Sequence, residues 1–155
     1  AAPATFEDVT DAAGVAMEEV SERGVFAFTS AFSDLDDDGW PYTAPVWHEY
    51  RDGGFYLVGR EESLWAHYMS RNPRVSICID TVANPAKVLV QGSAEVVERP
   101  NIGGKWVAIA RRMALRYLGE DGPKYLEPTM KDPRWLIFIR PKSLKTWHRN
   151  FSRLQ

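Results

Sequence analysis

Acidic side chains form the densest group of potential ligands in this sequence. Residues 34–39 read Asp-Leu-Asp-Asp-Asp-Gly, which is the opening pattern of a calcium-binding EF-hand loop. The twelfth position of such a loop should be a bidentate Glu, but here it is Pro45, and the flanking residues have the pattern of strands. We therefore interpret the run as an acidic turn between strands and predict no calcium site.

The histidines and the single cysteine do not form a metal-binding pattern. His48, His67 and His148 lie in different predicted elements, and neither H-x-x-x-H nor H-E-x-x-H occurs. Cys78 alone can form neither an internal disulfide nor a cysteine-based zinc site. The G-x-S-x-G, G-x-G-x-x-G and Walker patterns are also missing from the sequence. Motifs therefore assign no metal ligand and no catalytic side chain.

Charge is divided unevenly along the chain. Residues 1–62 carry fourteen acidic and three basic side chains, whereas residues 63–155 carry seven acidic and sixteen basic ones. This division indicates an anionic ligand or partner that meets the second part, or two parts that neutralise each other within one fold. Basic and aromatic residues do alternate at 134–135 and 147–149, but the pI is near 5.9, so we expect no nucleic-acid partner.

Length and composition favour one globular domain, which we assign to residues 1–155. A chain of 155 residues can bury one sizeable core, and 45% hydrophobic and 26% charged residues are typical of soluble proteins. We find neither a signal-peptide pattern nor an apolar run of about 20 residues, the length needed to span a bilayer. We therefore expect a cytoplasmic protein with no membrane partner.

Hydrophobic periodicity predicts an α+β chain that is mainly β-sheet. Apolar residues repeat every three or four positions in Thr5–Glu22 and Asn101–Leu118, which predicts two helices, and Ser63–Ser70 has the pattern of a shorter one. Residues 34–39 and Asp52–Gly54 are predicted turns. Six or seven antiparallel strands favour a small β-barrel with added helices. The predicted strands are Val25–Phe32, Tyr42–Tyr50, Phe55–Gly59, Arg74–Asp80, Lys87–Val97, Trp135–Arg140 and, after Pro141, Leu144–Trp147.

The predicted helix Asn101–Leu118 carries a basic stripe beside its apolar face. Ile102 belongs to the apolar face, whereas Lys105, Arg112 and Arg116 fall within about 20° of one another at 100° per residue. The stripe is either a solvated helix edge or a site for an anion.

The order and spacing of several short segments resemble the pyridoxamine 5′-phosphate oxidase-like family of split-barrel flavin and deazaflavin oxidoreductases. The resemblance covers about residues 6–147, and its most specific part is Asn-Pro-Arg-Val at 72–75 followed by Val-x-Val-x-Gly at 88–92. The close of the chain, from Ile139-Arg-Pro141 to Trp147, also looks like the last two strands of the family. The other segments are Phe26–Ser30, Asp38–Trp47, Asp52–Leu57 and Ser63–His67.

This resemblance implies a homodimer of six-stranded split barrels that binds FMN or the deazaflavin coenzyme F420 between its subunits and transfers hydride to or from a small substrate. In the family, the second and third strands and the short helix after them hold the ribityl phosphate. The residues implied here are Thr43, Val46, Trp47, His48, Val58, Gly59, Arg60, Ser63, Trp65 and His67, with Lys87 at the ring edge and Trp147 or Arg149 of a second copy framing the ring.

The chain departs from the family pattern at its phosphate-binding cations. Trp65 stands where the family has its most characteristic phosphate-binding Lys, Thr43 where the true oxidases have Arg, and His48 where they have Lys. Pyridoxamine phosphate oxidase activity itself is therefore not expected. Arg60 is the remaining permanent cation for the phosphate, and Trp65 either stacks on the ring or fills the core.

Two functions follow as hypotheses. The first is an FMN- or F420-dependent oxidoreductase, in which hydride chemistry belongs to the coenzyme and no side-chain acid or base is required. The alternative is a non-catalytic protein that binds a flavin, a tetrapyrrole or another anionic ligand in the same cleft.

Overall fold

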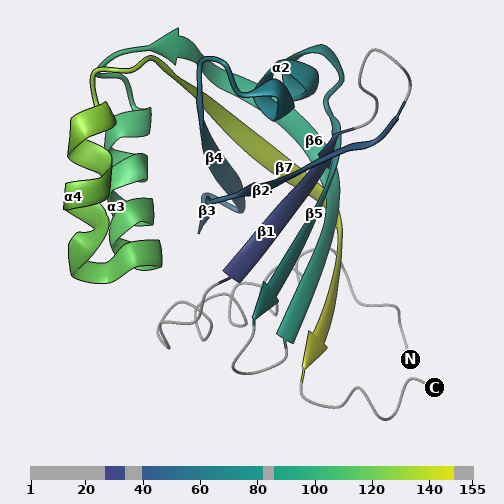
Figure 1. Ribbon diagram of the computed structural model, residues 1–155. Coiled ribbons are helices and arrows are strands. Elements are labelled where there is room, and N and C mark those ends of the chain that lie inside the picture. Colours follow the sequence, from purple (N-terminus) through teal and green to yellow (C-terminus); the bar gives the residue numbers. More distant parts are fainter. Residues whose placement is uncertain (1–26, 34–39, 82–85, 149–155) are drawn as a thin grey trace, which may run out of the picture.

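One antiparallel sheet of seven strands forms the body of the computed structural model, which describes residues 27–33, 40–81 and 86–148 (Figure 1). The order across the sheet is β2-β1-β5-β6-β7-β4-β3. The predicted helix 5–22 and the predicted acidic turn 34–39 lie outside the described residues. The strands are β1 (Ala27–Ser33), β2 (Tyr42–Val46), β3 (His48–Arg51), β4 (Gly54–Arg60), β5 (Arg74–Thr81), β6 (Ala86–Asn101) and β7 (Arg134–His148).

Helices occupy two places beside this sheet, which confirms a mainly-β chain of the α+β class (Figure 1). The helix α2 (Leu64–Arg71) follows β4 and confirms the predicted short helix. The helices α3 (Trp106–Leu118) and α4 (Gly122–Leu126) lie side by side between β6 and β7 in the chain. The segment between Gly119 and Thr129, which holds α4 and two 3-10 turns, was not predicted.

The predicted strand 42–50 is divided at Trp47 into β2 and β3. These two strands are consecutive in the chain, yet they occupy opposite edges of the sheet order. Because one residue joins them, the sheet has to curl until both of its edges approach Trp47. The aromatic residue at this junction is thereby placed between the two edges.

Local turn chemistry explains the β3–β4 hairpin. Asp52 and Gly53 connect the strands with positive φ values of 57° and 74°. A two-residue loop with both central residues at positive φ matches the twist of the flanking strands, and Asp-Gly is a preferred pair for it. The predicted tight turn is confirmed.

β7 continues through Pro141, so the expected end of a strand at Arg140 is wrong. Pro141 pairs with Gly92 of β6 beside a register shift, where a missing N–H is tolerated. A Cβ at Gly92 would overlap the carbonyl oxygen of Arg140, so glycine permits this close approach of the two strands. The two predicted last strands are therefore one bent strand.

The helix predicted from Asn101 begins at Trp106 because β6 extends to Asn101. The carboxylate of Glu98 accepts hydrogen bonds from the backbone N–H groups of Lys105 at 3.0 Å and Trp106 at 3.3 Å, and so caps α3. Ile102 is consequently 65% exposed in the loop and does not belong to the apolar helix face.

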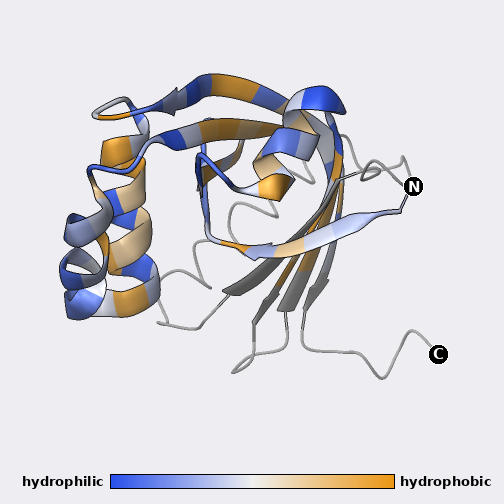
Figure 2. Cartoon of the chain, turned by 45° about the horizontal axis from the view of Figure 1, so that its top comes forward, coloured by the Kyte–Doolittle hydropathy of each residue, from blue (hydrophilic) through white to orange (hydrophobic). Residues whose placement is uncertain are grey.

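Two hydrophobic clusters lie on either side of β7. Ile137 belongs to the cluster inside the curled sheet, and its neighbour Leu136 belongs to the cluster under α3 and α4. This alternation is what a strand requires when both of its faces are buried. Figure 2 shows hydrophobic residues along the central strands and, mixed with polar ones, along the helical pair.

Candidate functional site

A pocket of about 290 Å³ opens where the β2–β3 junction, the end of β4, the start of α2 and the α3–α4 pair meet. Strand, helix and loop residues that are far apart in the sequence therefore share one wall. The lining residues are Pro45, Val46, Trp47, Val58, Gly59, Arg60, Ser63, Trp65, Ala110, Met113, Tyr125, Leu126 and Arg134.

The pocket brings together seven of the residues that the family resemblance implied as coenzyme ligands. They are Val46, Trp47, Val58, Gly59, Arg60, Ser63 and Trp65.

Of the other six implied residues, the three with described side chains, Thr43, His48 and His67, do not line this pocket. Thr43 and His67 are exposed elsewhere, and His48 is buried behind the wall. Lys87 and Trp147 pair with each other across β6 and β7, and residue 149 lies outside the described residues.

Two arginines stand opposite each other at the pocket wall. Arg60 ends β4 and Arg134 begins β7, and the two residues are direct partners in the antiparallel register. Like charges directly opposite each other destabilise a sheet. Neither arginine forms an ion pair with a carboxylate within the described part of the chain. The pair therefore leaves positive charge at the pocket.

Arg134 is only 8% exposed, and neighbouring side chains hold it in place. Its Nη2 donates to Thr129 Oγ1 at 2.6 Å, and its guanidinium lies 5.4 Å from the ring centroid of Trp106. Its Nε is buried and has no hydrogen-bond partner among residues that the structure describes. Burial lowers the pKa of Arg134, and the charge of Arg60 lowers it further. Motif analysis missed this residue because its pairing with β4 is non-local.

The first turn of α2 also begins at the pocket. Ser63 precedes the helix, its side chain makes no capping hydrogen bond, and its N–H donates to the carbonyl oxygen of Arg60 at 3.0 Å. The first N–H groups of a helix lack partners within the helix and carry partial positive charge. They add to the positive potential that the arginines create.

Aromatic side chains form the rest of the wall. Trp47 stacks on Tyr117 with ring centroids 5.0 Å apart and planes at 10°, and it also contacts Tyr125 at 5.4 Å. Trp65 packs against Gly59, where an added Cβ would come within 2.7 Å of the indole. Trp65 therefore both lines the pocket and packs on the sheet core, and its stacking on a coenzyme ring stays a prediction.

His48 supports this aromatic wall from the interior. Its Nδ1 lies 3.0 Å from the hydroxyl of Tyr117, which also accepts a 3.3 Å hydrogen bond from the His48 backbone N–H. Burial, with a smaller contribution from Arg116, lowers the pKa of His48 to about 3. The imidazole is therefore neutral near pH 7 and does not replace the missing family lysine as a cation.

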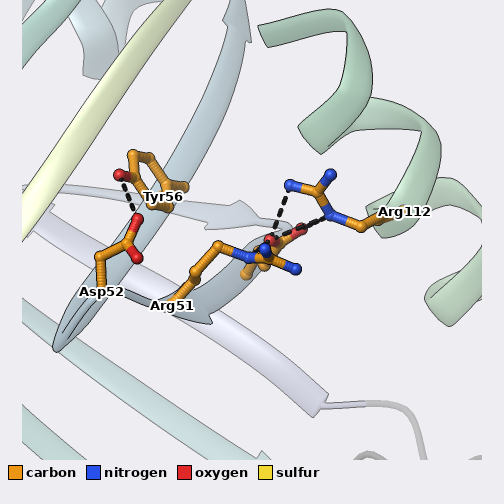
Figure 3. Close-up of polar contacts among 5 residues, drawn as sticks. Arg51, Asp52, Tyr56 and Arg112 are labelled. Atoms are coloured by element: carbon orange, nitrogen blue, oxygen red, sulfur yellow. Dashed lines mark hydrogen bonds and ion pairs between the residues drawn. The ribbon is translucent and has the colours of Figure 1, made fainter. Parts of the chain in front are cut away.

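An ion cluster fixes the helical side of the pocket to the sheet (Figure 3). Glu49 of β3 accepts hydrogen bonds from Nε of Arg51 at 2.7 Å and from Nε and Nη2 of Arg112 in α3, each at 2.9 Å. Beside it, the hydroxyl of Tyr56 donates to Asp52 at 2.8 Å, and this bond raises the pKa of Tyr56. Arg112, one of the three residues of the predicted basic stripe, therefore binds a carboxylate of the protein itself.

The sequence matches the family model described as pyridoxamine 5′-phosphate oxidase over residues 17–148. The chain belongs to this family. No curated protein matches it.

Solved structures share the fold of this family member at low sequence identity. An F420 reductase is 22% identical with a TM-score of 0.63, over 83% of this chain and 94% of the reductase. The heme storage protein HutZ of Vibrio cholerae is 14% identical with a TM-score of 0.61, over 88% and 94%. A FAD-binding protein of Mesorhizobium loti is 18% identical with a TM-score of 0.53, over 86% and 90%. Identities this low establish a common fold.

The pocket fits one end of a phosphorylated aromatic coenzyme. Arg134 offers a buried donor without a partner in the described structure, Arg60 adds a second cation, and Trp47 provides a flat apolar wall. Its volume of about 290 Å³ lies near the lower end of the roughly 300–1,000 Å³ that is usual for ligand pockets. The pocket of one chain could therefore enclose only part of a coenzyme the size of FMN or F420.

In the described ranges, no three His, Cys, Asp or Glu side chains lie close enough together to hold a metal ion. None of the helices described is long and apolar enough to cross a membrane.

Proposed function

We propose that this chain is an oxidoreductase that binds FMN or F420 in the pocket and transfers hydride to or from a small substrate. The observation that carries the proposal is that one pocket gathers residues implied by the family resemblance from β2, β4 and the start of α2. Membership of the family and the shared fold of an F420 reductase support it.

Each wall of the pocket has a proposed role. Arg60, Ser63 and the backbone near Val46 bind the phosphate and ribityl chain, and Trp47 and Trp65 lie against the ring. The bound coenzyme supplies the hydride chemistry. The side chains of this protein bind and orient the coenzyme and exclude water from one of its faces.

Pyridoxamine phosphate itself is not the proposed substrate. Thr43 is exposed outside the pocket, His48 is buried with a pKa of about 3, and Trp65 fills space against Gly59. The cations by which the true oxidases bind phosphate are thus replaced by residues that are uncharged near neutral pH.

We also propose that the curled sheet is a split barrel that works as a cytoplasmic homodimer. One chain encloses about 290 Å³, so a second copy is needed to cover the remainder of the coenzyme. The family resemblance implies that Lys87 lies at the ring edge and that Trp147 or Arg149 of a second copy frames the ring.

A non-catalytic binding protein for a flavin, a tetrapyrrole or another anionic ligand is the second candidate. Trp65 stands at the position of the characteristic lysine and packs on the sheet core, which narrows the pocket. The heme storage protein HutZ has the same fold. In this candidate the pocket binds the ligand without turnover.

Spectroscopy separates these possibilities. The purified protein is titrated with FMN, F420 and heme while its visible absorption and the coenzyme fluorescence are recorded. The proposal predicts saturable binding of FMN or F420, followed by rapid reduction with NADH or NADPH or reoxidation by a small acceptor. Binding without any such redox change supports the non-catalytic candidate. If neither FMN nor F420 binds, the proposed oxidoreductase function is refuted for both coenzymes.

A further inference from the structure

We propose that Arg60 and Arg134 form a paired-arginine site for a phosphate monoester dianion, and that this site makes the pocket select FMN over F420. The coenzyme part of this inference rests on the proposed function. The anion site itself rests only on the positions of Arg60 in β4, Arg134 in β7 and Thr129 in the 3-10 turn that precedes β7.

The strand register brings the two guanidinium groups to one place. Arg60 and Arg134 are direct cross-strand partners, and both line the pocket. Arg60 is exposed, whereas Arg134 is 8% exposed and its buried Nε has no partner in the described part of the chain. Two like charges held together with an unused buried donor are stabilised when an anion binds between them.

The surroundings hold Arg134 in one orientation. Thr129 Oγ1 accepts from Arg134 Nη2 at 2.6 Å and donates to the carbonyl oxygen of Leu126 at 2.9 Å. The ring of Trp106 lies under the guanidinium at 5.4 Å. Nη2 of the guanidinium is thus held by Thr129, whereas the Nε–H remains available to donate a hydrogen bond to a ligand. Thr129 is a positioning residue for this site.

Charge distinguishes the phosphate groups of the two coenzymes. A phosphate monoester carries about −1.5 to −2 near pH 7, whereas the phosphodiester of F420 carries a single negative charge. Asp132 and Glu62 are close enough to act electrostatically on Arg134, but neither forms an ion pair with it. The start of α2 at Ser63 adds further positive potential. The net positive potential of the two arginines and the start of α2 favours the dianion.

The test compares FMN with riboflavin, which has the same ring and no phosphate. Dissociation constants are measured by fluorescence quenching for the wild type and for Arg60→Met, Arg134→Lys, Arg134→Met and Thr129→Val, with Arg111→Met as the matched control. Arg111 is an exposed arginine that pairs with Glu127 away from the pocket. F420 is titrated in parallel, and thermal melts with inorganic phosphate supply a readout without any ring.

We expect the wild type to bind FMN more tightly than riboflavin and F420. Arg60→Met and Arg134→Met should each lower the ratio of FMN to riboflavin affinity by about 10- to 100-fold, because a charged hydrogen bond to the phosphate is lost. Arg134→Lys and Thr129→Val should lower the ratio less, and Arg111→Met should leave it unchanged. Because Arg60 is exposed, Arg60→Met tests the site even if Arg134→Met does not fold.

Three results would overturn the inference. One is an unchanged ratio in Arg60→Met. The second is equal affinity of the wild type for FMN and riboflavin, and the third is tighter binding of F420 than of FMN. If neither FMN nor F420 binds but inorganic phosphate raises the melting temperature of the wild type and not of Arg60→Met, the anion site stands and the proposed function fails. If phosphate has no such effect either, both fail.

Discussion

The two buried basic side chains His48 and Arg134 differ in their charge state. His48 is fully buried, and burial lowers its pKa to about 3, so it stays neutral and bonds to the hydroxyl of Tyr117. Arg134 is almost as buried, but an arginine keeps its charge in proteins. The first therefore supports the aromatic wall, and the second keeps a charge available at the pocket.

The neutral state of His48 predicts acid sensitivity. Unfolded chains protonate this histidine near pH 6.5 and the folded protein only near pH 3. Its contribution to stability is therefore complete above pH 6.5 and falls as the pH is lowered toward 3, by up to about 1.4 kcal/mol per pH unit. Urea unfolding between pH 7 and 5 should show a smaller slope for His48→Gln. The exposed His67→Gln is the control, and equal slopes for the wild type and His48→Gln would contradict the assignment.

Close packing of Trp65 on Gly59 predicts the effect of a substitution at Gly59. Gly59→Ala should destabilise the protein by about 1–3 kcal/mol, because the new methyl group overlaps the indole. In a Trp65→Leu background the same change should cost less than about 1 kcal/mol, since the overlap is gone. Chemical denaturation of the four proteins gives the coupling, and an equal cost in both backgrounds would show that the indole does not pack there.

At the scale of elements, two glutamates place α3 over the pocket. Glu98 of β6 caps its first N–H groups, and Glu49 of β3 binds Arg112 in its middle. Ala110 and Met113 of the same helix line the pocket. The position of the pocket wall thus depends on contacts between α3 and two strands that are distant in the sequence.

Removal of the Glu49 carboxylate tests this dependence. Glu49→Gln should destabilise the protein by about 1–3 kcal/mol, because Glu49 is largely buried and two arginines lose their partner. It should also weaken FMN binding, because α3 is less firmly held. Glu127→Gln, which affects an exposed pair with Arg111, should cost less than about 1 kcal/mol. A Glu49→Gln protein with unchanged stability and FMN affinity would rule out this role.

Elements that depend on local signals were predictable from the sequence, and those that depend on pairing were not. Asp52 and Gly53 fix a hairpin by their own backbone preferences, and Gly119 ends α3 with a φ of 57°. The continuation of β7 through Pro141 depends on Gly92 of another strand. Likewise, the motifs indicated Arg60, but only the register of β4 with β7 reveals Arg134 beside it.

At the scale of the whole molecule, the sheet order explains why the pocket forms. β2 and β3 occupy opposite edges of the sheet and are joined at Trp47, so the curl of the sheet brings both edges to the pocket that α3 and α4 border. The basic second part of the chain, residues 63–155, also contributes a cation to the pocket. Arg134, one of the basic residues of the second part, lies opposite Arg60 of the first part.

The limited volume of the pocket predicts a homodimer. Light scattering after size-exclusion chromatography should give twice the chain mass of 17.6 kDa, because a second copy has to cover the coenzyme. Addition of FMN should stabilise the dimer further, since a ligand that binds only one state shifts the equilibrium toward it. A species that stays at the mass of one chain with saturating FMN would contradict the dimer.

A crystal structure of the protein with FMN would show whether a phosphorylated coenzyme binds in this pocket. We expect electron density for the phosphate between Arg60 and Arg134 and for the ring against Trp47. Density for FMN at any other place on the protein would contradict this expectation.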